Sequence, residues 1–148
     1  MPALLKISDA VSLAFHTMGV LAEHADACLS TKDIAEQLLV SEHHLQKVHQ
    51  RLAKMGLIRA IRGPKGGFQL NKPAEKITLL EIYEAIDGPL TPSQCFLGRP
   101  KCSRENCILG QMNDQVNELV MNYFQKVTID KLNSADLAKI IKKSMKNR

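Results

Sequence analysis

Apolar residues recur at intervals of three and four near the beginning of the chain, which is the spacing of one face of a helix. These positions are Val11, Phe15, Met18 and Ala22. Ser8 precedes them and can cap a helix, so a first helix is predicted to run to about His24. Ser30, with Asp33 three residues later, has the capping pattern of a short second helix. The residues that this helix would bury are Ile34 and Leu38.

A third helix is predicted to begin after Ser41 and to stop at Gly56. Its apolar face would contain Leu45, Val48, Leu52 and Met55. The following residues alternate roughly up to Arg62, turn over the glycine-rich residues 63–67 and return along residues 68–70, which predicts a β-hairpin. Helices followed by such a hairpin with a basic tip form a winged helix. The predicted fold class is therefore mainly α, a winged helix-turn-helix with a small β-hairpin wing.

A long amphipathic segment follows the hairpin region. Thr78 and Glu81 have the capping-box pattern of a fourth helix, which Gly88 would end. After a cysteine-bearing loop, a helix from about Ile108 to Val127 shows a narrow apolar seam. The seam consists of Leu109, Met112, Val116, Leu119, Tyr123 and Val127. A helix beyond a small domain has little core of its own to cover, so the seam predicts dimerisation rather than packing within one chain. A final helix around Leu137, Ile140 and Ile141 is also expected.

The charge of the chain is concentrated in one segment. The net charge is +5, but residues 41–76 hold eight Lys and Arg against two Glu, whereas residues 1–40 hold two Lys against five acidic residues. Such a block indicates a phosphate-facing surface, although a run of charge can also be an ordinary solvated face. With no apolar run long enough for a membrane span and no secretory pattern, a cytoplasmic protein without a membrane partner is expected.

Three of the four cysteines lie within thirteen residues, at Cys95, Cys102 and Cys107. In a protein without an export signal, clustered cysteines indicate metal or redox chemistry more often than structural disulfides. Thiolates are the soft ligands that iron–sulfur clusters and zinc favour, and both kinds of site need a fourth ligand. Cys28, alone and outside this loop, is expected to be a small packed residue. We find no nucleophile with a paired base and orienting group, so no catalytic residues and no enzyme activity are predicted.

The combination of an arginine-glycine wing with three loop cysteines resembles the Rrf-type family of bacterial winged-helix transcription regulators, which includes the iron–sulfur regulator IscR and the nitric-oxide sensor NsrR. The matching stretches are 6–9, 34–38, 52–58, 62–70, 77–79 and 127–132. The resemblance implies a homodimer, joined through the long helix, that binds a palindromic operator in double-stranded DNA. We expect a winged-helix DNA-binding domain at 1–88, a sensor loop at 89–107, and a dimerisation helix with a helical tail at 108–148.

By family position, Gln46 would face base edges in the major groove and Arg62 would enter the minor groove. Lys47, Arg51 and Lys65 would hold phosphates. The other residues assigned to this surface are Ser41, His43, His44 and Gly66.

The same resemblance bears on the fourth ligand. IscR-like members place a histidine three residues after the last cysteine, where this chain has Gly110. NsrR-like members use an aspartate near the start of the first helix of the other subunit, and Asp9 stands at that position. Its alternative is an ordinary acid in a first helical turn. His16 is a weaker candidate. The predicted cofactor is thus a 2Fe-2S or 4Fe-4S cluster on Cys95, Cys102, Cys107 and Asp9, with zinc as the alternative.

These features predict a regulator, expected to repress, whose operator binding responds to nitric oxide, redox state or iron–sulfur status. One alternative is the same scaffold with zinc, or with thiols that are oxidised directly. A different class is an iron–sulfur electron-transfer protein, for which the basic helix and wing would have no purpose. A further alternative is a winged helix used for protein contacts, with the loop as a zinc staple.

Overall fold

The computed structural model describes residues 7–93, 95 and 105–132. Its N-terminal half contains three helices, α1 (Asp9–Glu23), α2 (Thr31–Leu38) and α3 (Glu42–Lys54). Each begins at the predicted serine, whose hydroxyl accepts a hydrogen bond from a backbone N–H of the first turn. Ser30 and Asp33 form the full capping box, and these hydrogen bonds lower the pKa of the Asp33 carboxyl. The three predicted helices are therefore confirmed.

The wing is the antiparallel pair β1 (Ile58–Ile61) and β2 (Gly67–Leu70), with Ile58 opposite Leu70 and Ile61 opposite Gly67. Leu29, between α1 and α2, extends this hairpin because its backbone exchanges hydrogen bonds of 2.7 and 3.1 Å with Phe68. Gly67 allows this close approach: a Cβ there would lie 2.3 Å from the carbonyl oxygen of Leu29. The wing is thus attached to the body at its base.

The 3₁₀ turn η1 (Ala74–Lys76) leads from the wing to α4 (Leu79–Asp87). Thr78 is the N-cap residue of α4. Glu81 completes the predicted capping box, and Lys72 also binds its carboxylate. Burial opposes the charge of Glu81, but the hydrogen bonds from Lys72 and Thr78 outweigh this effect and lower its pKa. Gly88, with φ +82°, ends the helix as predicted.

α1 lies at the centre of the core, where it packs against α3 and α4. Its inward face includes Val11, Ala14 and Met18, all fully buried. The predicted core positions Ile34, Leu38, Ile82 and Ile86 are buried as well. Met55 is an exception, because its side chain is 58% exposed. It caps the C-terminus of α3 just before Gly56 turns the chain in the left-handed region, so it no longer lies on the buried face.

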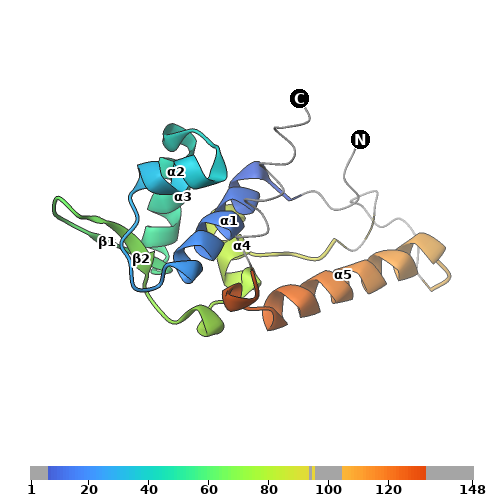
Figure 1. The fold of residues 1–148 in the computed structure, drawn as a ribbon. Coiled ribbons are helices and arrows are strands. Elements are labelled where there is room, and N and C mark those ends of the chain that lie inside the picture. The colour runs from blue at the N-terminus through green and yellow to red at the C-terminus, as the bar shows by residue number, and fades with distance from the viewer. Residues whose placement is uncertain (1–6, 94, 96–104, 133–148) are drawn as a thin grey trace, which may run out of the picture.

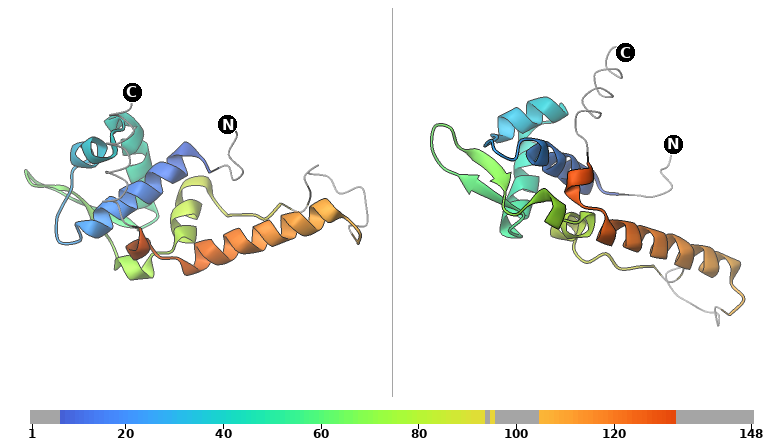
Figure 2. Two further views of the ribbon diagram at one scale, coloured as in Figure 1. Left: turned by 45° about the vertical axis from the view of Figure 1, so that its right-hand side comes forward. Right: turned by 60° about the horizontal axis from the view of Figure 1, so that its bottom comes forward.

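The long helix α5 (Ile108–Lys126) projects away from this body, as two further views also show (Figures 1 and 2). Its C-terminal end is attached: Phe124 is buried against the rings of Phe15 and Tyr83, with centroids 5.8 and 5.9 Å away. After α5 the chain pairs with residues at and just before the start of α4: the N–H of Leu79 donates to the carbonyl of Val127 at 3.0 Å, and the N–H of Ile129 donates to that of Ile77 at 2.9 Å. The 3₁₀ turn η2 (Ile129–Lys131) follows.

The predicted final helix around Leu137, Ile140 and Ile141 lies outside the described residues. Within the described part of the chain, no helix combines the length and the apolar composition that a membrane span needs. Five members of the predicted seam are exposed on α5, between 47 and 69%: Leu109, Met112, Val116, Leu119 and Tyr123. Val127 does not belong to this face, because it follows the helix and is half-buried where its carbonyl accepts the N–H of Leu79.

Candidate nucleic-acid interface and cysteine loop

α3 is divided sharply into two faces. Leu45, Val48 and Leu52 face the core and are at most 2% exposed. Five of the residues assigned to DNA lie on the exposed part of this helix or at its N-terminal cap: Ser41, His43, His44, Gln46 and Lys47. This helix therefore presents a row of hydrogen-bonding and basic side chains, which is what readout of base edges and phosphates requires.

The tip of the wing carries the two basic residues that the sequence pointed out. Arg62 and Lys65 are both exposed, and the hairpin that bears them extends beyond the helical body (Figure 1). A tight turn holds the tip, in which the N–H of Gly66 donates to the carbonyl of Gly63 at 2.9 Å. Gly66 itself has no room for a side chain, because a Cβ would lie 2.3 Å from the carbonyl oxygen of Ile61. Its assigned contact with DNA can therefore involve only its backbone.

Arg51 is held differently from the other assigned cations. Its Nη1 donates to the carbonyl oxygen of Ile86 at 2.9 Å, near the C-terminal end of α4. A cation at this place stabilises the negative end of the helix dipole. Arg51 thus fixes α4 to the recognition helix, and only its remaining N–H groups are free of this bond for the predicted phosphate contact.

His49 lies beneath the candidate interface and was not predicted from the sequence. Its side chain is 1% exposed and lies between α2, α3 and the wing. Nδ1 is 3.2 Å from the hydroxyl of Thr31, and the ring is 4.6 Å from that of Phe68. Burial lowers the pKa of His49 to about 4. The sequence signal that could have predicted its burial is its position four residues after Leu45, on the apolar face of the helix.

The cysteine loop is attached to α5 at both of its described ends. Cys107 is the N-cap of α5, and its Sγ accepts the backbone N–H of Gly110 at 3.2 Å. Near the other end, Asn113 and Asn117 on α5 donate to the carbonyl of Ser93, and the Ser93 hydroxyl donates to the carbonyl of Cys95. Cys95, Cys107 and Cys28 are free thiols, each partly buried. Cys102 lies outside the described residues.

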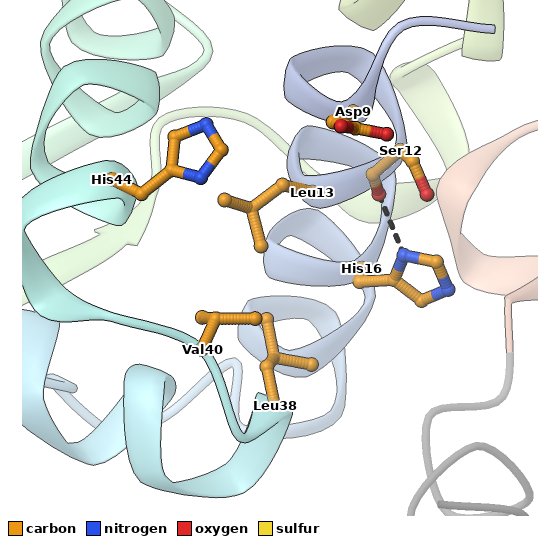
Figure 3. Close-up of a pocket in the computed structure, with 7 residues that line it drawn as sticks. All are labelled: Asp9, Ser12, Leu13, His16, Leu38, Val40 and His44. Carbon is orange, nitrogen blue, oxygen red and sulfur yellow. Dashed lines mark hydrogen bonds between the residues drawn. The ribbon is translucent and has the colours of Figure 1, made fainter.

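Asp9 lies at the rim of a pocket of about 410 Å³ between α1 and the start of α3. Figure 3 shows His44 of α3 and Leu13 of α1 pointing toward one another across it. His16 turns its Nδ1 to the carbonyl of Ser12, at 2.6 Å. Leu38 and Val40 complete the apolar side of the pocket. Among the described residues, no three His, Cys, Asp or Glu side chains are grouped so as to hold a metal ion.

An exposed recognition helix beside a basic β-wing defines the class of winged-helix DNA-binding transcription regulators. The CymR global cysteine regulator of Bacillus subtilis has the same fold, with a TM-score of 0.75 at 27% identity over 89% of this chain and 98% of CymR. The chain belongs to the Rrf2 family of iron-dependent transcriptional regulators, whose family model matches residues 7–135. The family consists of regulators rather than enzymes, as the sequence analysis predicted.

Two further relatives place the chain within this family. A helix-turn-helix transcriptional regulator of Aquifex aeolicus is 30% identical over 128 residues, which cover 84% of this chain and 89% of the relative. IscR of Pectobacterium atrosepticum is 29% identical over 101 residues, which cover 68% of this chain and 61% of IscR. The predicted family is confirmed.

Proposed function

We propose that the chain is a homodimeric operator-binding repressor whose DNA affinity is set by an iron–sulfur cluster on its cysteine loop. The observation that carries this proposal is the attachment of both described ends of the loop to α5. That helix also carries the exposed apolar face and returns the chain to the winged-helix body. A change at the loop would therefore act on the element that sets the distance between two DNA-binding units. We propose that residues 1–88 form the DNA-binding domain, residues 89–107 the sensor loop and residues 108–148 the dimerisation region. We also propose that the protein is cytoplasmic.

The α5 face supports the homodimer. Its exposed apolar residues lie beside the face that carries Asn113 and Phe124, which are buried against the protein's own chain. A second copy of the same helix would cover this face by two-fold symmetry, so that each subunit offers the same patch to the other. Two recognition helices related by such an axis bind a palindromic operator.

The DNA contacts follow from the two exposed surfaces. Gln46 reads base edges in the major groove, Arg62 enters the minor groove, and Lys47 and Lys65 hold phosphates. Removal of a specific base contact costs about 1–3 kcal/mol and relaxes sequence preference, whereas removal of a phosphate contact weakens binding to all sequences. Gln46→Ala should therefore change the preferred operator in a selection from random DNA, and Gln111→Ala on α5 should not. An unchanged preference in Gln46→Ala would remove this assignment.

The donor set fits an iron–sulfur cluster in its chemistry. Cys95 and Cys107 are free thiols, and the sulfur of Cys107 sits at the positive end of the α5 dipole, where a negatively charged ligand is favoured. Cys102 would supply the third sulfur. Gly110 has no side chain to offer, and it is buried beside Cys107. We propose that Asp9 of the partner subunit is the fourth ligand, because its carboxylate is exposed at the first turn of α1.

A bound cluster would supply chemistry that oxygen, nitric oxide or iron shortage can alter. The chain's own residues would transmit the change: without the cluster, Cys95, Cys102 and Cys107 would no longer be held together, and the loop would constrain the N-terminal part of α5 less tightly. Two recognition helices joined through α5 would lose their match to the operator spacing. A carboxylate ligand suits this role, because it is a weaker ligand to iron than a thiolate and makes the cluster easier to lose.

The experiment is anaerobic purification of the full chain, followed by an electronic spectrum and counts of iron, sulfide and zinc. Visible sulfur-to-iron absorption with iron and sulfide in the protein is expected. Asp9→Asn should accelerate loss of this absorption in the presence of a chelator, while Asp26→Asn, which removes an exposed acid just after α1, should not. A protein that contains zinc but no sulfide would contradict the proposed cluster and favour the zinc alternative.

A second candidate is a regulator that senses through its thiols directly. Its support is the structural likeness to a global cysteine regulator and the presence of free, partly buried thiols at both described loop ends. Metal analysis separates the two candidates. In the second case the purified dimer would carry neither iron nor zinc, and mild oxidation alone would change its operator affinity.

A further inference from the structure

The inward face of α5 changes character along the helix. Near the body it is apolar: Phe124 is 7% exposed, and Val120 packs against the core. Toward its N-terminus the same face carries Asn113 and Asn117, one helical turn apart, and Asn113 is also only 7% exposed. A buried amide is costly unless it forms hydrogen bonds. The buried amide of Asn113 therefore needs a hydrogen-bond partner.

Both amides share that partner. Nδ2 of Asn117 donates to the backbone carbonyl oxygen of Ser93 at 2.7 Å, and Nδ2 of Asn113 donates to the same oxygen. A carbonyl oxygen has two lone pairs and can accept both bonds. The hydroxyl of Ser93 in turn donates to the carbonyl of Cys95 at 3.2 Å. A chain of side-chain hydrogen bonds thus joins the backbone of Cys95 to α5.

The two described loop cysteines are consequently held by one stretch of one helix. Cys107 caps α5 through the N–H of Gly110, and the Cys95 end is held one to two turns further along by Asn113 and Asn117. Because two amides one turn apart bind the same carbonyl, they fix both its position along the helix axis and its direction. An apolar contact would not do so, because hydrophobic attraction has no direction.

We propose that Asn113 and Asn117 are positioning residues for Cys95, which hold its end of the cysteine loop on α5 so that Cys95 and Cys107 meet a metal centre in a fixed relation to that helix. This inference rests on the metal-binding function proposed for the loop. It adds the connection through which the state of the loop reaches the dimer helix. Release of the Ser93 carbonyl uncouples the loop from α5 without the loss of any cysteine.

The first measurement is amide hydrogen exchange on the metal-free full chain of Asn113→Ala and Asn117→Ala. Asn122→Ala is the matched control, because Asn122 is an exposed asparagine on the opposite side of α5. Removal of either hydrogen bond should raise the amide exchange rates of Leu90, Thr91 and Ser93 by about three- to tenfold. Asn117→Ala is the milder variant, since Asn117 is less buried than Asn113, and it keeps the test valid if Asn113→Ala folds poorly. Unchanged exchange in both variants overturns the proposal.

The second measurement is the rate at which the anaerobically reconstituted variants lose their visible absorption to a chelator. The same two variants should lose it about three- to tenfold faster than the wild type, and the control should not. Faster exchange without faster loss overturns the positioning role. A wild-type chain that takes up neither iron nor sulfide overturns the proposed function instead. The cobalt(II) affinity of the cysteines then tests Asn113 and Asn117, and equal affinity in variants and wild type overturns their role as well.

Discussion

The imidazole of His49 and the ring of Phe68 lie 4.6 Å apart, so a residue of the recognition helix touches a residue of the wing in the interior of the protein. The helix and the wing, which are the two elements proposed to bind DNA, thus share this contact. Thr31, whose hydroxyl lies 3.2 Å from Nδ1 of His49, adds the start of α2 to the same junction. The relative placement of helix and wing therefore depends on a neutral histidine.

The stability of the protein should fall between pH 6.5 and pH 4 because of this histidine. The pKa of His49 is lowered from 6.5 to about 4 in the folded state, so the unfolded chain takes up a proton in this range and the folded chain does not. The contribution of neutral His49 to the free energy of unfolding is fully present above pH 6.5 and is lost as the pH falls through about 4. The steepest slope should be about 1.4 kcal/mol of unfolding free energy per pH unit. Urea unfolding of the wild type and of His49→Phe across this range checks it, and equal slopes in the two proteins would contradict it.

Gly67→Ala should destabilise the wing more than Gly63→Ala does. Both glycines have positive φ, at +154° and +122°, but only at Gly67 would a Cβ meet backbone atoms, those of Leu29. The expected decrease for Gly67→Ala is about 1–3 kcal/mol of unfolding free energy, together with weaker operator binding. Thermal unfolding and DNA titration of both variants measure this. A smaller loss of stability for Gly67→Ala than for Gly63→Ala would show that the close approach of Leu29 does not exclude a side chain at position 67.

Leu119→Glu should raise the dissociation constant of the dimer at least about tenfold, because it places a charge in the middle of the exposed apolar face of α5. Gln125→Glu adds the same charge on another exposed side of the helix and should leave the dimer intact. Sedimentation velocity over a range of concentrations distinguishes the two. A dimer that Leu119→Glu leaves unaffected would place the interface elsewhere.

Arg62→Ala and Lys65→Ala should each flatten the salt dependence of operator binding by about one unit of log affinity per log salt, because each removes one positive charge that would displace a counterion from the DNA. For Arg62, whose proposed place is the minor groove, a change in sequence preference should accompany the flatter slope. Lys126→Ala, an exposed lysine at the end of α5, is the control. Binding titrations at several salt concentrations give the slopes, and slopes equal to that of the wild type would remove the wing from the interface.

Local signals were sufficient for most of the fold. Capping side chains at Ser8, Ser30, Ser41 and Thr78 and the glycine at position 88 mark helix ends within a few residues, so the sequence alone located them. The bond from Leu29 to Phe68 and the pairing of Ile77 with Ile129 join distant parts of the chain, and no local pattern announces them. Met55 was misplaced for a similar reason, since helical spacing continues past the residue at which the helix stops.

The candidate site was less predictable than the fold. The basic wing and the exposed face of α3 follow from residue type and spacing, and their exposure in the structure agrees with that prediction. The bond from Arg51 to Ile86 could not be foreseen, because a surface arginine looks the same in sequence whether it faces phosphate or a helix end. Asn113 and Asn117 gave no signal either: asparagine on a helix is usually solvated, and only the approach of Ser93 buries one of them.

The pairing of residues 77–79 with residues 127–129 fixes both ends of the intervening segment at one place on the winged-helix body. The start of this segment belongs to the core, because Ile82 and Ile86 of α4 are buried and the carbonyl of Ile86 accepts the bond from Arg51. Near the end of the segment, Phe124 packs against Phe15 and Tyr83. The part between these two anchors can therefore change in length and chemistry without the loss of core contacts. Under the proposed function, a graft of residues 89–119 from another family member would transfer its signal to this chain's operator.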